Sequence, residues 1–264
     1  MTPQATYDDD LRLAHAIADQ VDALTMSRFK ALDLHVETKP DHSPVSDADK
    51  AAEDLVRNVL ARSRGRDAFL GEETGASGHG SRQWVLDPID GTKNFVRGVP
   101  VWATLIALLV DGEPVVGLVS APALQRRWWA ARGSGAWSGR SLSAATRLHV
   151  SGVSSLDDAS FSYSSLTGWQ DIDRLTGLLT ISDAVWRTRA YGDFWSYMLV
   201  AEGAVDAAAE PELALHDMAA LVPIVTEAGG RFTSLAGEDG PHGGNALATN
   251  GLLHDAFLEH LGTD

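Results

Sequence analysis

One short segment, residues 84–92 (Trp-Val-Leu-Asp-Pro-Ile-Asp-Gly-Thr), constrains this chain more than any other. An apolar strand here ends in Asp87 and Asp90, which a Gly-Thr turn follows. Pro88 has no N–H to donate to a sheet and Gly91 permits a tight turn, so both carboxylates can face one point. Functional side chains concentrate where rigid elements end, and carboxylate oxygens suit a hard divalent cation. The segment therefore predicts a metal site at the end of a strand.

Two carboxylates do not complete the octahedral shell of oxygen ligands that Mg²⁺ prefers. Glu72 and Glu73 end another apolar segment, and Asp217 starts a predicted helix. Each of these residues alone has an ordinary structural explanation as a helix cap, a turn residue or a solvated charge. Their chemistry becomes informative only if the fold brings them together.

The first half of the chain, residues 1–147, has the pattern of helices packed on an antiparallel sheet. Apolar residues recur at helical spacing from Asp10 to about Phe29, and a second helix is predicted from residue 46 or 47 to about 60. Residues 39–44 contain two prolines and are predicted to form a loop. The predicted strands, with a hairpin turn at Asp111-Gly112, are 83–86, 101–110, 115–120, 127–131 and 136–137.

The second half, residues 148–264, alternates helical and strand patterns, which is typical of α/β layers. The predicted strands are 160–163, 185–190, 204–208, 231–235 and 246–249, and the predicted helices are 193–201, 216–228 and 251–261. The fold class is therefore α+β followed by α/β, in two tightly joined halves.

Composition excludes several classes of function. The chain has no cysteine, so disulfides, thiolate nucleophiles and sulfur-ligated metals are absent. A net charge of -15 disfavours nucleic acid and anionic membranes as partners. Asp8, Asp9 and Asp10 stand where a signal peptide needs basic residues, and the longest apolar run, 101–110, is too short to span a membrane. A cytoplasmic location is expected.

Taken together, the acidic motifs resemble those of the inositol monophosphatase family of metal-dependent phosphatases. The resemblance rests on Gly-Glu-Glu at 71–73, Asp-Pro-Ile-Asp-Gly-Thr at 87–92 and His-Asp at 216–217. Residues 45–49 and 225–230 resemble an earlier and a later family motif, in family order. The resemblance thus covers nearly the whole chain and implies a layered α-β-α-β-α sandwich. It also suggests a homodimer.

The resemblance implies a reaction that uses about two or three Mg²⁺ ions per site. Asp87 would bridge two of them, and the motifs assign metal coordination to Glu72, Asp87, the backbone carbonyl of Ile89, Asp90 and Asp217. By the same resemblance, Thr92, hydrogen-bonded to Asp49, acts with Glu73 to order the water that attacks phosphorus.

General chemistry agrees with this assignment. The backbone N–H groups of Gly91 and Thr92 open a predicted helical turn and are natural phosphate donors. Two metals roughly 3.5–4 Å apart can bind the attacking and leaving oxygens of an in-line displacement. Without them a phosphate dianion would meet about five negative charges, so substrate binding is expected to depend on metal.

The family places substrate contacts near residues 189–194 and 209–211, which makes Arg189, Asp193 and Glu210 the candidate substrate residues. Inositol-specific members commonly have small residues where this chain has Asp193-Phe194, and a second acid suits a cationic leaving group. This run is similar to the histidinol-phosphate phosphatase branch, so L-histidinol phosphate is the expected substrate, in histidine biosynthesis. The alternatives are an inositol-1-phosphate or broad sugar-monophosphate phosphatase, and a catalytically silent binder of metal or phosphate ligands.

Three further features also carry expectations. His216 stands where many relatives have Trp, and it is expected to pack beside the site and leave the metal ligands unchanged. Lys39 is expected to be an exposed loop residue, although closure of its loop could bring it to the metal site. Trp128 and Trp129 are expected to face opposite sides of a strand, in a core or a subunit interface.

Overall fold

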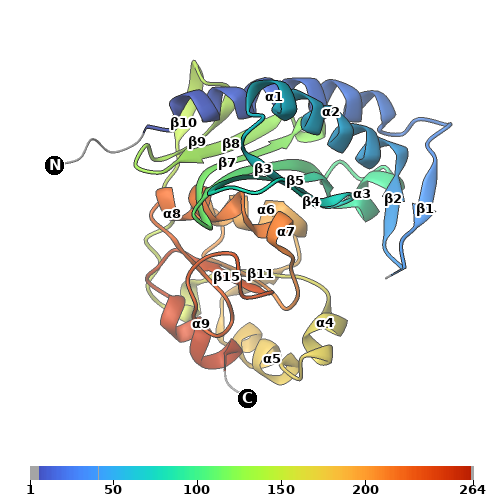
Figure 1. Ribbon diagram of the computed structural model, residues 1–264. Helices are drawn as coiled ribbons and strands as arrows, with labels where there is room; N and C mark the ends of the chain where they lie inside the picture. The colour runs from blue at the N-terminus through green and yellow to red at the C-terminus, as the bar shows by residue number, and fades with distance from the viewer. Residues whose placement is uncertain (1–5, 41, 263–264) are drawn as a thin grey trace.

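The computed structural model describes residues 6–40 and 42–262 of the chain. Within this part, the strands form a sheet of eight strands (the large sheet), a sheet of five (the small sheet) and one two-stranded hairpin. Helices cover the large sheet, separate the two sheets and cover the small sheet, so the layers run α-β-α-β-α (Figure 1). The expected layered sandwich is confirmed.

The first layer consists of α1 (Asp8–Arg28) and α2 (Asp47–Ser63), close to the two helices predicted from periodicity. Ser46 caps α2 in a capping box with Asp49, which fixes where the helix begins. The connection between these helices is not a plain loop, because β1 (Val36–Thr38) and β2 (Pro44–Ser46) pair as an antiparallel hairpin. Lys39 follows the first of these strands directly.

The large sheet has the strand order β10-β9-β8-β7-β6-β5-β3-β4, in which β3 and β5 are parallel and the other pairs antiparallel. Asp111-Gly112 turns β6 into β7 as predicted. Trp128 and Trp129 are both buried, on opposite faces of β8 as the alternation predicts. The strands are β3 (Ala68–Gly71), β4 (Gly75–Ser77), β5 (Arg82–Asp90), β6 (Ala103–Val110), β7 (Glu113–Ala121), β8 (Arg126–Ala131), β9 (Ala136–Ser141) and β10 (Ala144–Arg147).

The middle layer contains α6 (Asp193–Ala201), α7 (Leu215–Met218) and α8 (Leu221–Glu227). The single helix predicted over 216–228 is wrong, because the chain breaks between α7 and α8. Pro223 has no N–H to donate and its ring crowds the preceding turn, so it is accommodated in the first turn of a new helix. Gly117 of β7 lies against the break, since a Cβ there would clash with the carbonyl oxygen of Ala220.

The small sheet has the strand order β12-β11-β13-β15-β14, with the first three strands parallel and the last two antiparallel to their neighbours. Its strands are β11 (Ser160–Tyr163), β12 (Arg187–Arg189), β13 (Ala207–Glu210), β14 (Arg231–Thr233) and β15 (Ala246–Thr249). The strand predicted at 204–208 begins and ends later, which places Glu210 at its last position. The predicted division at residue 147 falls between the two sheets. The division into two tightly joined halves stays a prediction.

The last layer is formed by α4 (Leu166–Asp171), α5 (Leu175–Ala184) and α9 (His254–Leu261). Helices α4 and α5 were not predicted from sequence, because each contains a glycine, which is a poor helix former. Gly177 has a packing role, because a Cβ there would clash with the carbonyl oxygen of His260 in α9. Short helices α3 (Thr92–Arg97), η1 (Pro122–Leu124) and η2 (Leu156–Asp158) complete the fold. None of the described helices is both long and apolar enough to cross a membrane.

Candidate metal and phosphate site

A cavity of about 560 Å³ opens where β5 ends. Its walls come from the β1–β2 hairpin, the residue after β3, the end of β5 with the start of α3, the start of α6, and residues 212–217. Segments from both halves of the sequence therefore meet at one point. Most of the residues predicted to bind metal and phosphate lie in this wall.

A β-bulge brings Asp87 and Asp90 together. Residues three apart on a regular strand point to opposite faces of the sheet. In the pairing of β5 with β6, however, Asp87 lies opposite Leu105 and Asp90 opposite Ala103, so β5 contains one extra residue. The bulge returns both carboxylates to one side. One oxygen each of Asp87, Asp90 and Asp217 lie within 4.8 Å of one another.

The electrostatics of this cluster fit a divalent cation. Burial, followed by neighbouring carboxylates, raises the pKa of Asp87 and of Asp90 well above the usual range. Burial also raises the pKa of Asp217, although His216 and the N–H of Ala214 oppose the shift. Asp87 is 2% exposed, and its Oδ1 atom has no hydrogen-bond partner among the described residues. A hard cation satisfies such oxygens and offsets their mutual repulsion.

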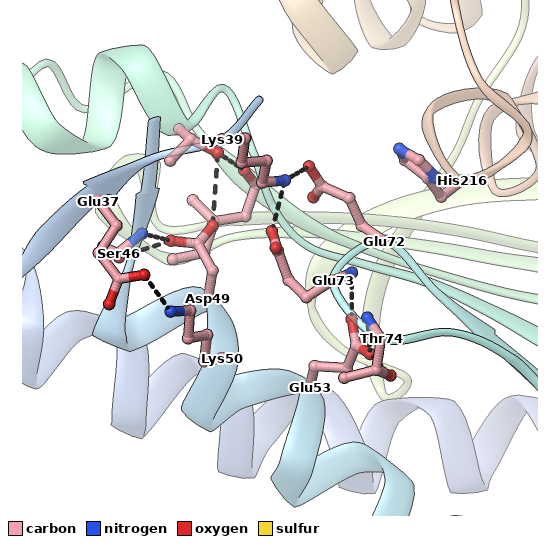
Figure 2. Close-up of polar contacts among 12 residues, drawn as sticks. Glu37, Lys39, Ser46, Asp49, Lys50, Glu53, Glu72, Glu73, Thr74 and His216 are labelled. Carbon is pink, nitrogen blue, oxygen red and sulfur yellow. Dashed lines mark hydrogen bonds and ion pairs between the residues drawn. The ribbon is translucent and has the colours of Figure 1, made fainter. Parts of the chain in front are cut away.

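Lys39 reaches the edge of this cluster (Figure 2). Its Nζ atom lies 2.6 Å from Oε1 of Glu72 and 2.8 Å from Oε1 of Glu73. Burial lowers the pKa of Lys39, but the hydrogen bonds to the two glutamates outweigh burial and raise it. Because the Lys39 side chain is only 20% exposed, the expectation of an exposed loop lysine is wrong.

His216 also lies in the cavity wall. One of its ring nitrogens and one oxygen each of Glu72 and Asp87 lie within 4.8 Å of one another. Its Nε2 atom is 3.6 Å from Oδ1 of Asp217. His216 therefore packs beside the site, as expected from sequence, and it also offers a nitrogen donor to the same space.

Thr92 and Asp49 approach each other, as the family motif implies, but the contact is long. The hydroxyl of Thr92 donates to the carbonyl of Ile89 at 2.9 Å and lies 3.4 Å from Oδ1 of Asp49. Asp49 accepts bonds from the N–H and hydroxyl of Ser46 at 2.8 and 2.5 Å. Burial raises the pKa of Asp49 to about 6, against the effect of Ser46.

Gly91 makes the turn between β5 and α3. Its φ of 81° is left-handed, which glycine adopts without strain. A Cβ at this position would lie 3.0 Å from the carbonyl oxygen of Val101 and 3.1 Å from Oδ2 of Asp193. Thr92 then begins α3, where the first N–H groups of a helix have no partners within it. Gly91, Thr92 and Lys93 line the cavity, and their binding of phosphate stays a prediction.

The three predicted substrate residues lie in different surroundings. Asp193 lines the cavity at the start of α6, and burial with the nearby Asp217 raises its pKa. Burial, then repulsion from Asp193, raises the pKa of Glu210 to about 8. Arg189 is exposed at the end of β12, donates to the carbonyl of Thr188 at 2.7 Å, and is not among the described residues that line the cavity. The cavity wall instead includes Glu212, which the sequence analysis did not single out.

The fold and the acidic cavity together define a phosphatase of the metal-dependent class. The sequence model of the inositol monophosphatase family matches residues 7–263, and the chain belongs to this family. The family resemblance drawn from the motifs is thereby confirmed.

Individual relatives narrow the comparison. The chain is 67% identical to a histidinol-phosphatase from Streptomyces coelicolor, over 97% of each chain. It is 61% identical to a histidinol-phosphatase from Mycobacterium tuberculosis, over 96% of this chain and 98% of that protein. Among solved structures, an inositol monophosphatase from Zymomonas mobilis matches with a TM-score of 0.87 and 32% identity, covering 98% of this chain and 100% of the other.

Proposed function

We propose that this enzyme hydrolyses L-histidinol phosphate to L-histidinol and phosphate. The observation that carries the choice of substrate is a pair of acids, the half-buried Asp193 and the buried Glu210, beside the metal carboxylates. Burial raises the pKa of both acids and so favours their neutral form. A nearby ammonium or imidazolium group would favour the charged form. A charge-assisted hydrogen bond of this kind is worth about 1.5 to 3 kcal/mol. The identity to two histidinol-phosphatases supports the same choice.

The residues proposed to hold Mg²⁺ are Glu72, Asp87, the carbonyl of Ile89, Asp90 and Asp217. The bound cation would neutralise the carboxylates and polarise the phosphoryl oxygens. The N–H groups of Gly91 and Thr92 would hold the phosphate. The hydroxyl of Thr92 donates to the Ile89 carbonyl, so its oxygen can accept a hydrogen bond from the attacking water. Asp49 and Glu73 are then placed to orient that water and to receive its proton.

The test is the ratio of kcat/KM for L-histidinol phosphate to that for inositol 1-phosphate at saturating Mg²⁺. We expect a ratio of about 10³ or more, which corresponds to roughly 4 kcal/mol of transition-state discrimination. A ratio near one would reject the substrate and leave a phosphatase for inositol or sugar monophosphates. A silent binder would release no phosphate with or without Mg²⁺.

We also infer that the enzyme acts in histidine biosynthesis and is a cytoplasmic homodimer. Each site is proposed to hold about two or three Mg²⁺ ions, which is consistent with a two-metal mechanism. The pathway follows from the proposed substrate, and the dimer is supported by family resemblance. Light scattering of the purified protein tests the dimer, because a particle with the mass of one chain would reject it.

A further inference from the structure

Glu53, in the middle of α2, is a buried carboxylate to which neither the motifs nor the proposed mechanism gives a role. Its exposed fraction is 0%, and it points at the turn that follows β3 (Figure 2). Oε2 accepts the N–H of Glu73 at 2.8 Å, and Oε1 accepts the N–H of Thr74 at 2.9 Å. The hydroxyl of Thr74 also donates to Oε1. All three donors belong to the turn that carries Glu72 and Glu73.

From this geometry we propose that Glu53 is a positioning residue: it holds the turn at residues 72–74 so that Glu72 is oriented to bind the divalent cation and Glu73 lies beside it. The inference concerns the metal end of the proposed active site and does not depend on the organic part of the substrate. Glu53 acts from behind the turn. The side chains of Glu72 and Glu73 extend the other way, toward Lys39 (Figure 2). Glu72 also lines the cavity.

Backbone shape shows how closely Glu53 is fitted to this turn. A Cβ on Gly71 would lie 2.3 Å from the carboxyl carbon of Glu53, so a side chain before Glu72 would displace that carboxylate. On the other side, the N–H of Glu72 donates to the carbonyl of Leu86 in β5 at 3.2 Å. The turn is therefore held between β5 and Glu53, and only Glu53 contacts the N–H groups of both Glu73 and Thr74 among the hydrogen bonds of the described residues.

A buried carboxylate is costly unless hydrogen bonds or a cation compensate for it. Arg57 approaches only to 3.4 Å, so the turn supplies the closest hydrogen bonds to Glu53. An apolar residue here would leave two backbone N–H groups without this acceptor. Groups that orient metal ligands typically contribute about 10-fold to 100-fold to metal affinity.

The experiment compares Glu53→Gln with the unmodified protein. Gln keeps the size of the side chain but replaces one acceptor oxygen with an NH₂ donor. One of the two backbone N–H groups, of Glu73 or of Thr74, then faces another donor and loses its hydrogen bond. Mn²⁺ binding is measured by titration calorimetry without substrate, and the Mg²⁺ concentration for half-maximal phosphate release is measured in parallel. We expect the Kd for Mn²⁺ to rise by at least about tenfold, while the circular dichroism spectrum is unchanged.

Glu227→Gln is the matched control. Glu227 of α8 also accepts two backbone N–H bonds from a turn, at 2.7 Å from Gly133 and 2.8 Å from Gly135, but that turn is not part of the cavity wall. This variant should bind Mn²⁺ like the unmodified protein even if its melting temperature falls. The comparison separates loss of a turn acceptor in general from loss of the one behind the metal ligands.

A Mn²⁺ affinity within about twofold of the unmodified value in folded Glu53→Gln would overturn the proposal. If this variant does not fold, Thr74→Val removes one bond from an exposed residue, and an unchanged Mn²⁺ affinity there overturns the proposal as well. Because no substrate is present, rejection of L-histidinol phosphate in the kinetic test would leave this result unaffected.

Discussion

At the scale of single residues, Asp193 combines an unusual backbone conformation with a half-buried carboxylate. Its φ is 47°, a left-handed value that Asp and Asn tolerate better than most residues. Its Oδ2 atom accepts a hydrogen bond from Nδ2 of Asn94 at 3.0 Å, which ties α6 to α3. The side chain thus has little freedom, which suits a group that recognises one end of a substrate.

Replacing Asp193 with Asn keeps the tolerated backbone and an acceptor oxygen but removes the charge. We expect kcat/KM for L-histidinol phosphate to fall by about 10-fold to 100-fold, because a charge-assisted bond becomes a neutral one. Inositol 1-phosphate, which has no cation, should change only a few-fold. An equal loss for both substrates would contradict the pairing of Asp193 with a cationic group.

At the scale of elements, the β1–β2 hairpin is the part of the site that carries a competing cation. The Lys39 ammonium lies 2.6 Å from Oε1 of Glu72, so a divalent cation bound by Glu72 would repel it and compete with it for that carboxylate. Lys39→Met should therefore lower the Kd for Mn²⁺ by several-fold, as measured by titration calorimetry. Lys50→Met is the control, because Lys50 pairs with Glu37 of the same hairpin, away from the cavity wall. Weaker Mn²⁺ binding in Lys39→Met would show that Lys39 assists binding instead.

The sequence predicts well those elements whose pattern lies within one continuous segment of the chain. The helices α1, α2 and α6 and the β6–β7 hairpin have continuous periodicity or an Asp-Gly turn, and they appear close to the predicted residues. The break at Pro223 was missed because α7 and α8 share one apolar pattern. Helices α4 and α5 were missed because their glycines serve contacts with distant segments, which sequence spacing does not reveal.

Prediction from sequence meets the same limit at the candidate site. Asp87 and Asp90 were found together because a single segment holds them, although the bulge that makes them face one way depends on pairing with β6. Glu53 lies 20 residues from Glu73, and Lys39 lies 33 residues from Glu72. Their roles depend on which side of a helix or hairpin meets the turn after β3. Only the packing of that turn identifies them.

At the scale of the whole molecule, the two halves share one core. A single cluster of buried side chains includes Val85 and Leu105 of the large sheet, Tyr197 and Ile224 of the middle helices, and Phe232 of the small sheet. Either half alone would expose its side of this cluster to water. We therefore expect the two halves to unfold together in one transition, because the cluster that they share holds them to each other.

Acid sensitivity of the fold should come in part from His254. Its ring is buried between β14 and β15, with nitrogens 2.9 Å from the hydroxyls of Thr233 and Thr249, and burial lowers its pKa to about 4. The unfolded chain binds a proton near the ordinary value of 6.5, while the folded chain does not until about 4. The contribution of neutral His254 to the free energy of unfolding is therefore fully present above pH 6.5 and is lost as the pH falls toward 4.

Urea unfolding between pH 7 and 5 measures this contribution. Glu210, whose pKa rises to about 8, contributes with the opposite sign, so slopes must be compared between variants. The free energy of unfolding of His254→Asn should fall less steeply with decreasing pH than that of the unmodified protein. His79→Gln, an exposed control, should keep the original slope. Equal slopes for both variants would assign the acid sensitivity to other groups.

The position of β5 has a further consequence for how the site exchanges with solvent. Asp87 sits on an interior strand, paired with β3 on one side and β6 on the other, whereas Lys39 sits at the tip of a two-stranded hairpin whose first strand is exposed. Amide protons of β5 should exchange with deuterium only through global opening, and those of β1 through local opening of much lower free energy. Asp87 can therefore stay fixed while Lys39 moves away from Glu72 and Glu73 and returns.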